Sequence, residues 1–317
     1  MKKIFTLKPV LIALLAMIGC TMKAEIVYYP ADDGFCYYLD TETLEATLGG
    51  YRGDATEVVI SEFVTYEGED YKVTSLGDFC FDGCSSLVTV ELPSSVVSLG
   101  GYCFDGCSSL TTIEIPSSVV SLGERCFRGC SSLPSIVIPS SVTSLGTSCF
   151  YDCSSLPAIE IPSSVTSVGH WCFYGCSSLK TVIWKMDKRI EDGSLFELVP
   201  TNVATLYVPK EMLELYNPPK KKDAKDPWRS FGTILPWTDE LEVSVDETSE
   251  FNIALKTYNG NVVVSGLTDG TPVSCYTIDG RMLGFTSADG GTASFVAEPN
   301  SIVIVRAVRQ TFKVYVK

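Results

Sequence analysis

A block of 23 residues recurs five times in register between Val73 and Asp187, and this strict period limits the possible folds more than any other feature. Every block contains the run (Leu/Val)-Gly-x-x-Cys-Phe-x-x-Cys-Ser-Ser-Leu. The first cysteines of the blocks are Cys80, Cys103, Cys126, Cys149 and Cys172, and a second cysteine follows each of them four residues later. A period of this length is typical of solenoids, in which each repeat packs against its neighbours and cannot fold alone.

Within one block, the apolar spacing predicts a strand followed by a tight return path. Leu110, Ile113 and Ile115 have the spacing of a leucine-rich-repeat strand with inward side chains, and Pro116 ends it because proline removes a ladder donor. We expect these strands to form a parallel sheet on the concave side. The Cys-Phe-x-x-Cys run is expected to form a short helical or 3-10 turn on the convex side, and Gly100 to adopt positive φ. The predicted fold class is therefore an α/β solenoid.

The repeat pattern and the composition divide the chain into five segments. Residues 1–24 are expected to be a signal peptide, 25–72 an N-terminal cap with half a repeat, 73–187 the five full repeats, 188–237 a degenerate repeat with a C-terminal cap, and 238–317 a separate domain. Leu195-Phe196-x-x-Val199 followed by Ala204–Pro209 predicts the sixth, degenerate rung. A short helix around Glu211 to Tyr216 is expected to close the stack.

The last segment predicts a small antiparallel β-sandwich. The expected strands are 262–264, 273–278, 292–296, 302–308 and 312–316. Asp279-Gly280 is a strong hairpin signal, and Asp289-Gly290-Gly291 marks another turn.

The N-terminus has the features of an export signal. Lys2, Lys3 and Lys8 accompany an apolar stretch, 10–18, that is too short for a spanning helix, which needs about 20 residues. The run that ends at Cys20 resembles a bacterial lipobox, in which this cysteine would be lipidated. Ordinary cleavage near Ala24 is the alternative. Both interpretations predict an exported protein, and a membrane contact only through a lipid on Cys20.

The charge and the residue inventory exclude several function classes. The net charge of −14 argues against nucleic acid as a partner, because affinity for phosphate backbones comes from clustered lysine and arginine. His170 is the chain's one histidine, and no fixed aspartate partner for a nucleophile triad is evident in the sequence. We therefore expect no enzyme activity and no cofactor, and an exposed turn position for His170.

The paired cysteines have three possible roles. A zinc site would need four ligands pooled from two rungs. Disulfides between rungs are permitted in an exported protein but have unfavourable geometry for stacked side chains. Burial as small apolar residues is favoured, because Leu195 and Val199 occupy the same positions in the degenerate rung and cannot ligate a metal.

The full block resembles the BspA-like leucine-rich repeats of bacterial surface proteins, although that family usually carries alanine at the first cysteine position. The resemblance covers about residues 56 to 237 and implies adhesion or another surface interaction. The segment from Val273 to Arg281, with the terminal Lys313 to Lys317, is similar to C-terminal sorting modules of type IX secretion cargo. A binding module is the alternative for this segment.

Two surfaces are candidates for binding. The outward strand positions form a mildly acidic, hydroxyl-rich stripe suited to a protein partner: Thr89, Glu91, Thr112, Glu114, Ser135, Val137, Ala158, Glu160, Thr181 and Ile183. The variable turn positions supply an aromatic set that either binds a partner or packs on the convex surface: Phe79, Tyr102, Arg125, Ser148 and Trp171, with Tyr151 and Tyr174 nearby.

The expected function is that of a non-enzymatic surface protein, in the outer membrane or on the cell surface, that mediates adhesion or protein interaction. A host or bacterial surface protein is the expected partner. A glycan-binding component and a structural spacer of the envelope are the alternatives.

Overall fold

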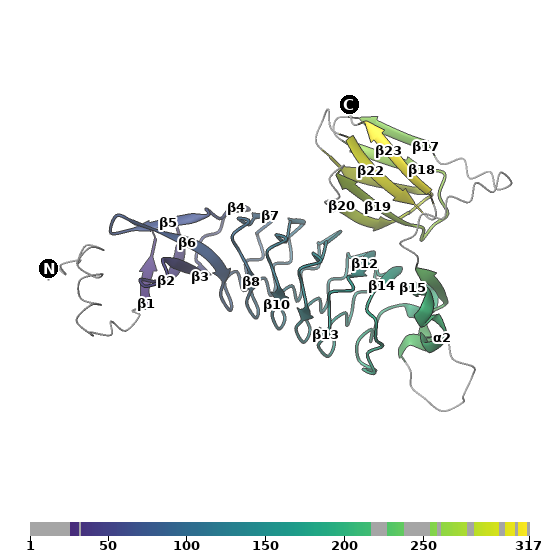
Figure 1. Cartoon of the computed structure of the whole chain (residues 1–317), viewed down its shortest axis with the longest axis horizontal. Helices are drawn as coiled ribbons and strands as arrows, with labels where there is room; N and C mark the ends of the chain where they lie inside the picture. The colour runs from purple at the N-terminus through teal and green to yellow at the C-terminus, as the bar shows by residue number, and fades with distance from the viewer. Residues whose placement is uncertain are drawn as a thin grey trace.

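The computed structural model describes residues 26–31, 33–216, 227–237, 254–258, 261–277, 282–297, 302–307 and 310–315. The repeats form a solenoid that extends along the long axis of the molecule, and a unit of two antiparallel sheets lies beside its C-terminal end (Figure 1). The segment with Cys20 and the turn at Asp279-Gly280 lie outside the described residues.

The N-terminal cap is a meander that turns into the first rung. Strands β1 (Ile26–Pro30), β2 (Phe35–Asp40) and β3 (Glu45–Tyr51) are antiparallel. Strand β3 then pairs in parallel with β6 (Glu69–Leu76), which also forms a hairpin with β5 (Phe63–Tyr66). This parallel pair starts the solenoid ladder.

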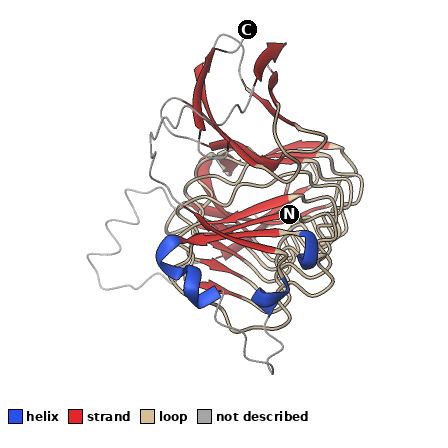
Figure 2. Ribbon diagram, turned by 90° about the vertical axis from the view of Figure 1, so that its right-hand side faces the viewer, coloured by secondary structure: helices blue, strands red, loops and turns tan. Residues whose placement is uncertain are grey.

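The rungs form two parallel ladders, of which only one was expected. The unexpected ladder continues from β6 through the short Ser-Leu segments β8 (Ser98–Leu99), β10 (Ser121–Leu122), β11 (Ser144–Leu145) and β13 (Ser167–Val168). The expected ladder comprises β4 (Glu57–Val59), β7 (Thr89–Glu91) and β9 (Thr112–Ile113), and then β12 (Ala158–Ile161), β14 (Thr181–Trp184), β15 (Thr205–Pro209) and β16 (Thr233–Trp237). The view turned by 90° shows these strands stacked behind one another (Figure 2).

Prolines at the start of two rungs interrupt the expected ladder between β9 and β12. At the equivalent position of other rungs, the amide of Thr111 donates to the carbonyl of Val88 at 2.9 Å, and that of Lys180 to Pro157 at 2.8 Å. Pro134 and Pro157 have no amide hydrogen to donate, so this bond is lost on both sides of the third rung. The parallel sheet is consequently divided in two.

Stacked side chains of the same type fill the interior. The rings of Phe81, Phe104, Phe127, Phe150, Phe173 and Phe196 form a column with centroids 5.2–5.7 Å apart and interplanar angles of 2–12°. Leu195 and Val199 are buried and continue the cysteine columns into the degenerate rung. The prediction that the cysteine positions belong to the apolar core is thus confirmed.

The Cys-Phe-x-x-Cys runs form turns, not helices, which corrects the expected α/β character. The residue before each first cysteine has a φ of 52–62°, outside the right-handed helical region. Alternate backbone amides of the run form hydrogen bonds to the next rung. The amide of Phe81 donates to the carbonyl of Cys103 at 2.7 Å, whereas the amide of Cys84 donates within its own turn, to the carbonyl of Phe81 at 3.1 Å. An α-helix needs all successive amides for bonds within its own segment, and here half of them are engaged elsewhere.

The glycine that precedes each turn is required for close approach and not for positive φ, contrary to expectation. Gly77, Gly100, Gly123, Gly146 and Gly169 are all absent from the positive-φ glycines. A Cβ on Gly123 would lie 2.4 Å from the carbonyl carbon of Gly100 in the preceding rung. Glycine here allows the backbones of successive rungs to touch.

Short helical segments close the C-terminal end of the stack. They are η1 (Thr201–Val203), η2 (Lys210–Met212), α2 (Leu213–Tyr216) and η3 (Pro227–Ser230). The helix expected near residue 211 is therefore present as η2 and α2, and strand β16 adds a further parallel rung that was not expected.

The C-terminal unit contains one sheet of β17 (Ala254–Tyr258), β18 (Asn261–Ser265) and β21 (Thr292–Val296), and another of β20 (Met282–Ser287), β19 (Pro272–Thr277), β22 (Ile302–Ala307) and β23 (Gln310–Tyr315). Buried residues of both sheets, among them Val264 and Val305, form one apolar cluster. Strands β17 and β20 were not expected. Gly284 weakens the strand pattern of β20 in the sequence. It packs against the ring of Phe295, and a Cβ at this position would lie 3.0 Å from the Cδ1 atom of that ring.

Candidate interaction surfaces

The outward stripe is exposed along the first three full rungs. Glu91, Thr112, Glu114 and Ser135 are exposed, and Thr89 and Val137 are half-buried. Strand β4 extends the stripe towards the N-terminus, where Val59 is 63% exposed. This part of the predicted surface is accessible to a partner.

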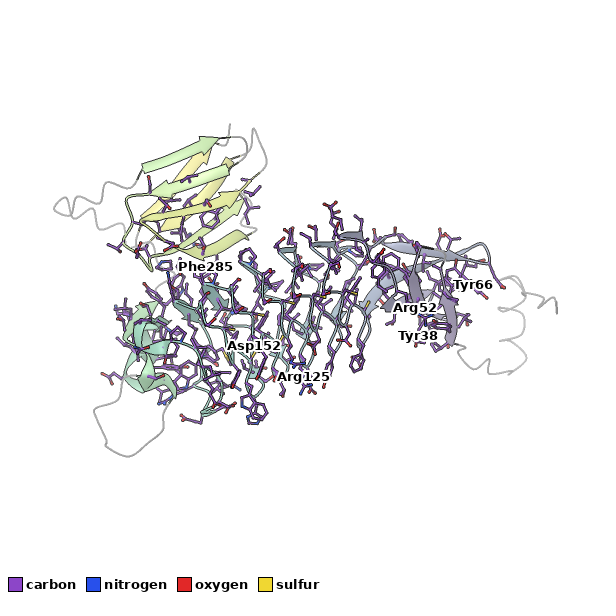
Figure 3. All side chains as sticks on the ribbon, turned by 180° about the vertical axis from the view of Figure 1, so that it is seen from behind. Tyr38, Arg52, Tyr66, Arg125, Asp152 and Phe285 are labelled. Atoms are coloured by element: carbon purple, nitrogen blue, oxygen red, sulfur yellow. The ribbon has the colours of Figure 1, made fainter. Side chains whose placement is uncertain are left out.

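The C-terminal unit covers the other end of the stripe. Phe285 of β20 packs in one cluster with Ala158 and Ile183, and Figure 3 shows this phenylalanine where the unit meets the solenoid. Thr181 donates to the carbonyl of Gly270 at 3.2 Å and accepts from the Ser287 hydroxyl at 2.7 Å.

Ala158, Thr181 and Ile183 are consequently buried, which corrects their predicted place on an exposed stripe. The sequence does carry a signal of this burial: isoleucine replaces glutamate at 183, and alanine replaces a hydroxyl residue at 158. Covering a polar side chain is costly unless it finds a partner, so covered positions favour apolar residues.

Glu160 lies at the border of this covered region and is largely sequestered. Its Oε1 is 3.0 Å from Nζ of Lys185, and both side chains are mostly buried. The same ammonium lies 4.6 Å from the ring centroid of Trp237. Glu160 therefore has an intramolecular partner and is not part of the accessible surface.

The turn residues with positive φ form a column along one edge of the solenoid. Phe79 and Tyr102 stack with centroids 4.6 Å apart, and the guanidinium of Arg125 lies 5.1 Å from the Tyr102 ring centroid. Tyr102 also donates to Glu124 at 3.2 Å. Packing between rungs thus accounts for part of the aromatic set, while Phe79 and Trp171 remain 54% and 46% exposed.

A second column lies three residues further along each turn. Asp105 pairs with Arg128 at 3.1 Å, Arg128 lies 5.7 Å from the Tyr151 ring centroid, and Tyr151 stacks on Tyr174 at 4.4 Å. The charged groups and rings of this column therefore have partners within the column. Tyr174 is half-buried and has an intramolecular partner, so it is a weaker binding candidate than the sequence indicated.

His170 has an aspartate partner that sequence analysis did not find. Its Nδ1 lies 2.9 Å from Oδ2 of Asp192, which belongs to the loop after the fifth rung. Ser194 donates to the other carboxylate oxygen from its amide at 3.0 Å and from its hydroxyl at 2.8 Å. Because this hydroxyl is bonded to the carboxylate and not to the imidazole, the three side chains do not have the relay geometry of a nucleophile triad.

The carboxyl of Asp192 has a lowered pKa. Its partial burial acts to raise the pKa, but the hydrogen bonds from Ser194 and the neighbouring His170 outweigh this effect.

The repeat cysteines serve packing and local hydrogen bonding. Those in the described part of the chain are all free, and nearly all are buried. The thiols of Cys107, Cys130, Cys153 and Cys176 donate to phenylalanine carbonyls of neighbouring rungs at 3.1–3.3 Å. Desolvation raises the pKa of these thiols, for example to about 12 for Cys176, which disfavours the thiolate needed for metal binding.

Two kinds of special site are absent from the part of the chain that is described. No group of three or more His, Cys, Asp or Glu side chains has a geometry that could hold a metal ion there. Among these same residues, no helix has the length and apolar character needed to cross a bilayer.

Comparison with known proteins identifies the repeat type. Residues 68–212 match the BspA type leucine rich repeat region in six copies. No curated protein matches the chain.

Solved structures of bacterial leucine-rich repeat proteins are also similar. One from Bacteroides ovatus is 26% identical with a TM-score of 0.46, covering 58% of this chain and 56% of its own length. One from T. pallidum is 28% identical with a TM-score of 0.46, covering 65% and 82%. A leucine rich cell surface protein from Faecalibacterium prausnitzii is 20% identical with a TM-score of 0.36, covering 67% and 73%.

Proposed function

We propose that this chain is a non-enzymatic bacterial surface protein that binds a protein partner through the accessible half of its outward stripe. The observation that supports this proposal is the contrast along the stripe. Glu91, Thr112, Glu114 and Ser135 project from unobstructed rungs, whereas the equivalent positions of the last rungs are covered. Small-molecule sites are mostly apolar concavities, so a row of exposed carboxylates and hydroxyls better suits a protein surface of complementary charge.

The partner surface is expected to be basic. The chain carries a net charge of −14, so its field favours the approach of cationic surfaces and repels anionic ones. Complementary charge acts mainly on the association rate and on specificity, and it is screened by salt. Binding should therefore weaken as the ionic strength rises.

Charge reversal tests the proposal. The double variant Glu91→Lys/Glu114→Lys is compared with a matched control, Glu45→Lys/Glu197→Lys, which makes the same charge change at exposed positions away from the stripe. Both are applied to an array of immobilised proteins and glycans. Each exposed ion pair contributes about 0.2–1 kcal/mol, and reversal replaces attraction by repulsion at two sites, so we expect about tenfold weaker protein binding for the stripe variant alone. Equal weakening by both variants, or a lack of any protein binding, would refute the proposal and favour a spacer role.

Surface location and export are part of the same proposal. The apolar N-terminal segment is inferred to direct export, with Cys20 as the lipid attachment site. The two C-terminal sheets are inferred to form a β-sandwich, whose sequence resemblance to type IX sorting modules supports a role in sorting to the surface. The mass of an acyl chain on Cys20 tests the anchor, and surface labelling of cells that express a chain truncated after Trp237 tests the sorting role.

A further inference from the structure

We propose that Trp171, His170 and Asp192 form a carbohydrate-binding site at the turn edge of the fifth rung. The site lies outside the outward stripe and goes beyond the protein interaction proposed above. Its three side chains combine an exposed aromatic face with two polar groups whose orientation is fixed.

Trp171 differs from the other large residues of its column because it has no ring or cation beside it in the column. Phe79, Tyr102 and Arg125 stack on one another, but the column neighbours of Trp171 are Ser148 and Ser194. Trp171 as a whole residue is 46% exposed.

The polar groups of the site come from a position where the repeat pattern changes. Asp192 occupies the place that glycine holds in every full repeat, and its carboxylate is held by both donors of Ser194. The other carboxylate oxygen lies 2.9 Å from Nδ1 of His170. Nε2 of this largely exposed imidazole is therefore directed away from Asp192. The His170 ring lies 6.1 Å from the Trp171 ring at an angle of 54°.

This arrangement has the chemistry that recognises a pyranose ring. One face of a sugar presents C–H groups with slight positive charge, which pack on the electron-rich face of an indole. Its hydroxyls need donors and acceptors at the edge of that face, which imidazole Nε2 can supply. Asp192 acts as a positioning residue, because its carboxylate is engaged by His170 and Ser194 and holds the imidazole in place. The imidazole and indole planes, inclined at 54°, would limit the orientation of the bound ring.

The test follows the indole N–H signals by NMR during titration with four probes: the methyl glycosides of glucose, galactose, mannose and N-acetylglucosamine. From the ligand efficiency of small ligands and about 13 non-hydrogen atoms, we expect a Kd of about 1 mM for the best probe. The Trp171 signal should shift, while the signals of buried Trp184 and Trp228 should remain unchanged.

Three variants separate the site from general effects. Asp192→Asn should weaken binding about tenfold and Trp171→Ala should abolish it, with binding read from the sugar signals. The matched control Phe79→Ala removes an equally exposed aromatic residue from the same column and should leave binding unchanged. Trp171→Phe, which keeps a flat ring, should retain weak binding and guards against loss of the fold.

The proposal is overturned if no probe shifts the Trp171 signal, or if Phe79→Ala reduces binding as much as Trp171→Ala. The Glu91→Lys/Glu114→Lys variant should bind the glycosides normally, so failure of this site and failure of the protein-binding stripe are distinguishable.

Discussion

Alanine at two equivalent glycines should have opposite effects on stability. In Gly123→Ala, the new Cβ would lie 2.4 Å from the carbonyl carbon and 2.5 Å from the oxygen of Gly100, so the backbones of two rungs would have to separate. In Gly77→Ala, the nearest atoms would be the Leu48 oxygen and the Thr47 methyl, each at 3.4 Å, which is ordinary contact.

The expected magnitudes follow from this difference in space. Neither glycine has positive φ, so the alanine backbone itself is not strained in either variant. Gly77→Ala should be neutral or stabilise by up to about 1 kcal/mol, because alanine restricts the unfolded chain. Gly123→Ala should destabilise by about 3 kcal/mol, at the upper end of the cost of overpacking, since backbone atoms cannot rotate away as side chains do.

Urea unfolding followed by far-UV circular dichroism measures both effects. In thermal unfolding, the difference corresponds to a Tm lowered by roughly 6–12 °C for Gly123→Ala. Equal destabilisation by the two substitutions would refute the close-approach explanation and would restore the view that this position needs a special backbone conformation. Unchanged stability of Gly123→Ala would show that neighbouring rungs can separate at little cost.

Three further predictions concern thiols, pH and the C-terminal unit. In native protein, iodoacetamide should label half-buried Cys84 before fully buried Cys126, because burial raises the pKa of both thiols but excludes reagent only from the second; uniform labelling in peptide mass maps would contradict this. The lowered pKa of Asp192 means that the folded state binds fewer protons there than the unfolded state, so the contribution of this group is present above the unfolded pKa of about 3.9 and is lost as the pH falls below it. The stability difference between wild type and Asp192→Asn should accordingly shrink below about pH 4 in urea titrations, and a difference that stays constant would contradict the assignment. Phe285→Asp should release the C-terminal unit, seen as faster hydrogen exchange in β12 and β14 with the other rungs unchanged; unaltered exchange would show that the contact is not maintained by this ring.

The period made much of the solenoid predictable, because burial repeats with the sequence. The inward positions of Leu110, Ile113 and Ile115 and the replacement of cysteine by Leu195 followed from spacing alone, and all are buried. The second ladder was not predictable in this way. A two-residue strand such as Ser98–Leu99 is too short to show alternation, and its pairing depends on the stacking that the other parts of the rung produce.

Contacts between segments that are distant in the sequence were also not predictable from the repeat. The hydrogen bond between Thr181 and Ser287 joins residues 106 positions apart, and no periodic pattern connects them. The pairing of His170 with Asp192 was missed for a related reason, since Asp192 lies in a loop where the repeat has changed and its partner is one rung away. Spacing within a repeat predicts which way a side chain points, but it does not predict what arrives to cover it.

Departures from the repeat have different causes, which depend on what surrounds them. At Ala158 and Ile183 the departure coincides with the C-terminal unit, and burial against Phe285 is a sufficient explanation. At Asp192 the departure places a carboxylate at the position that glycine occupies in all five full repeats, in a loop where the repeat has changed. That carboxylate is largely buried and holds the exposed imidazole of His170 beside an indole without a stacked neighbour, so packing alone does not account for it. A departure from the repeat that orients an exposed polar group beside an exposed ring is the stronger indicator of binding, and by this criterion the turn edge at Trp171 ranks above the rest of its column.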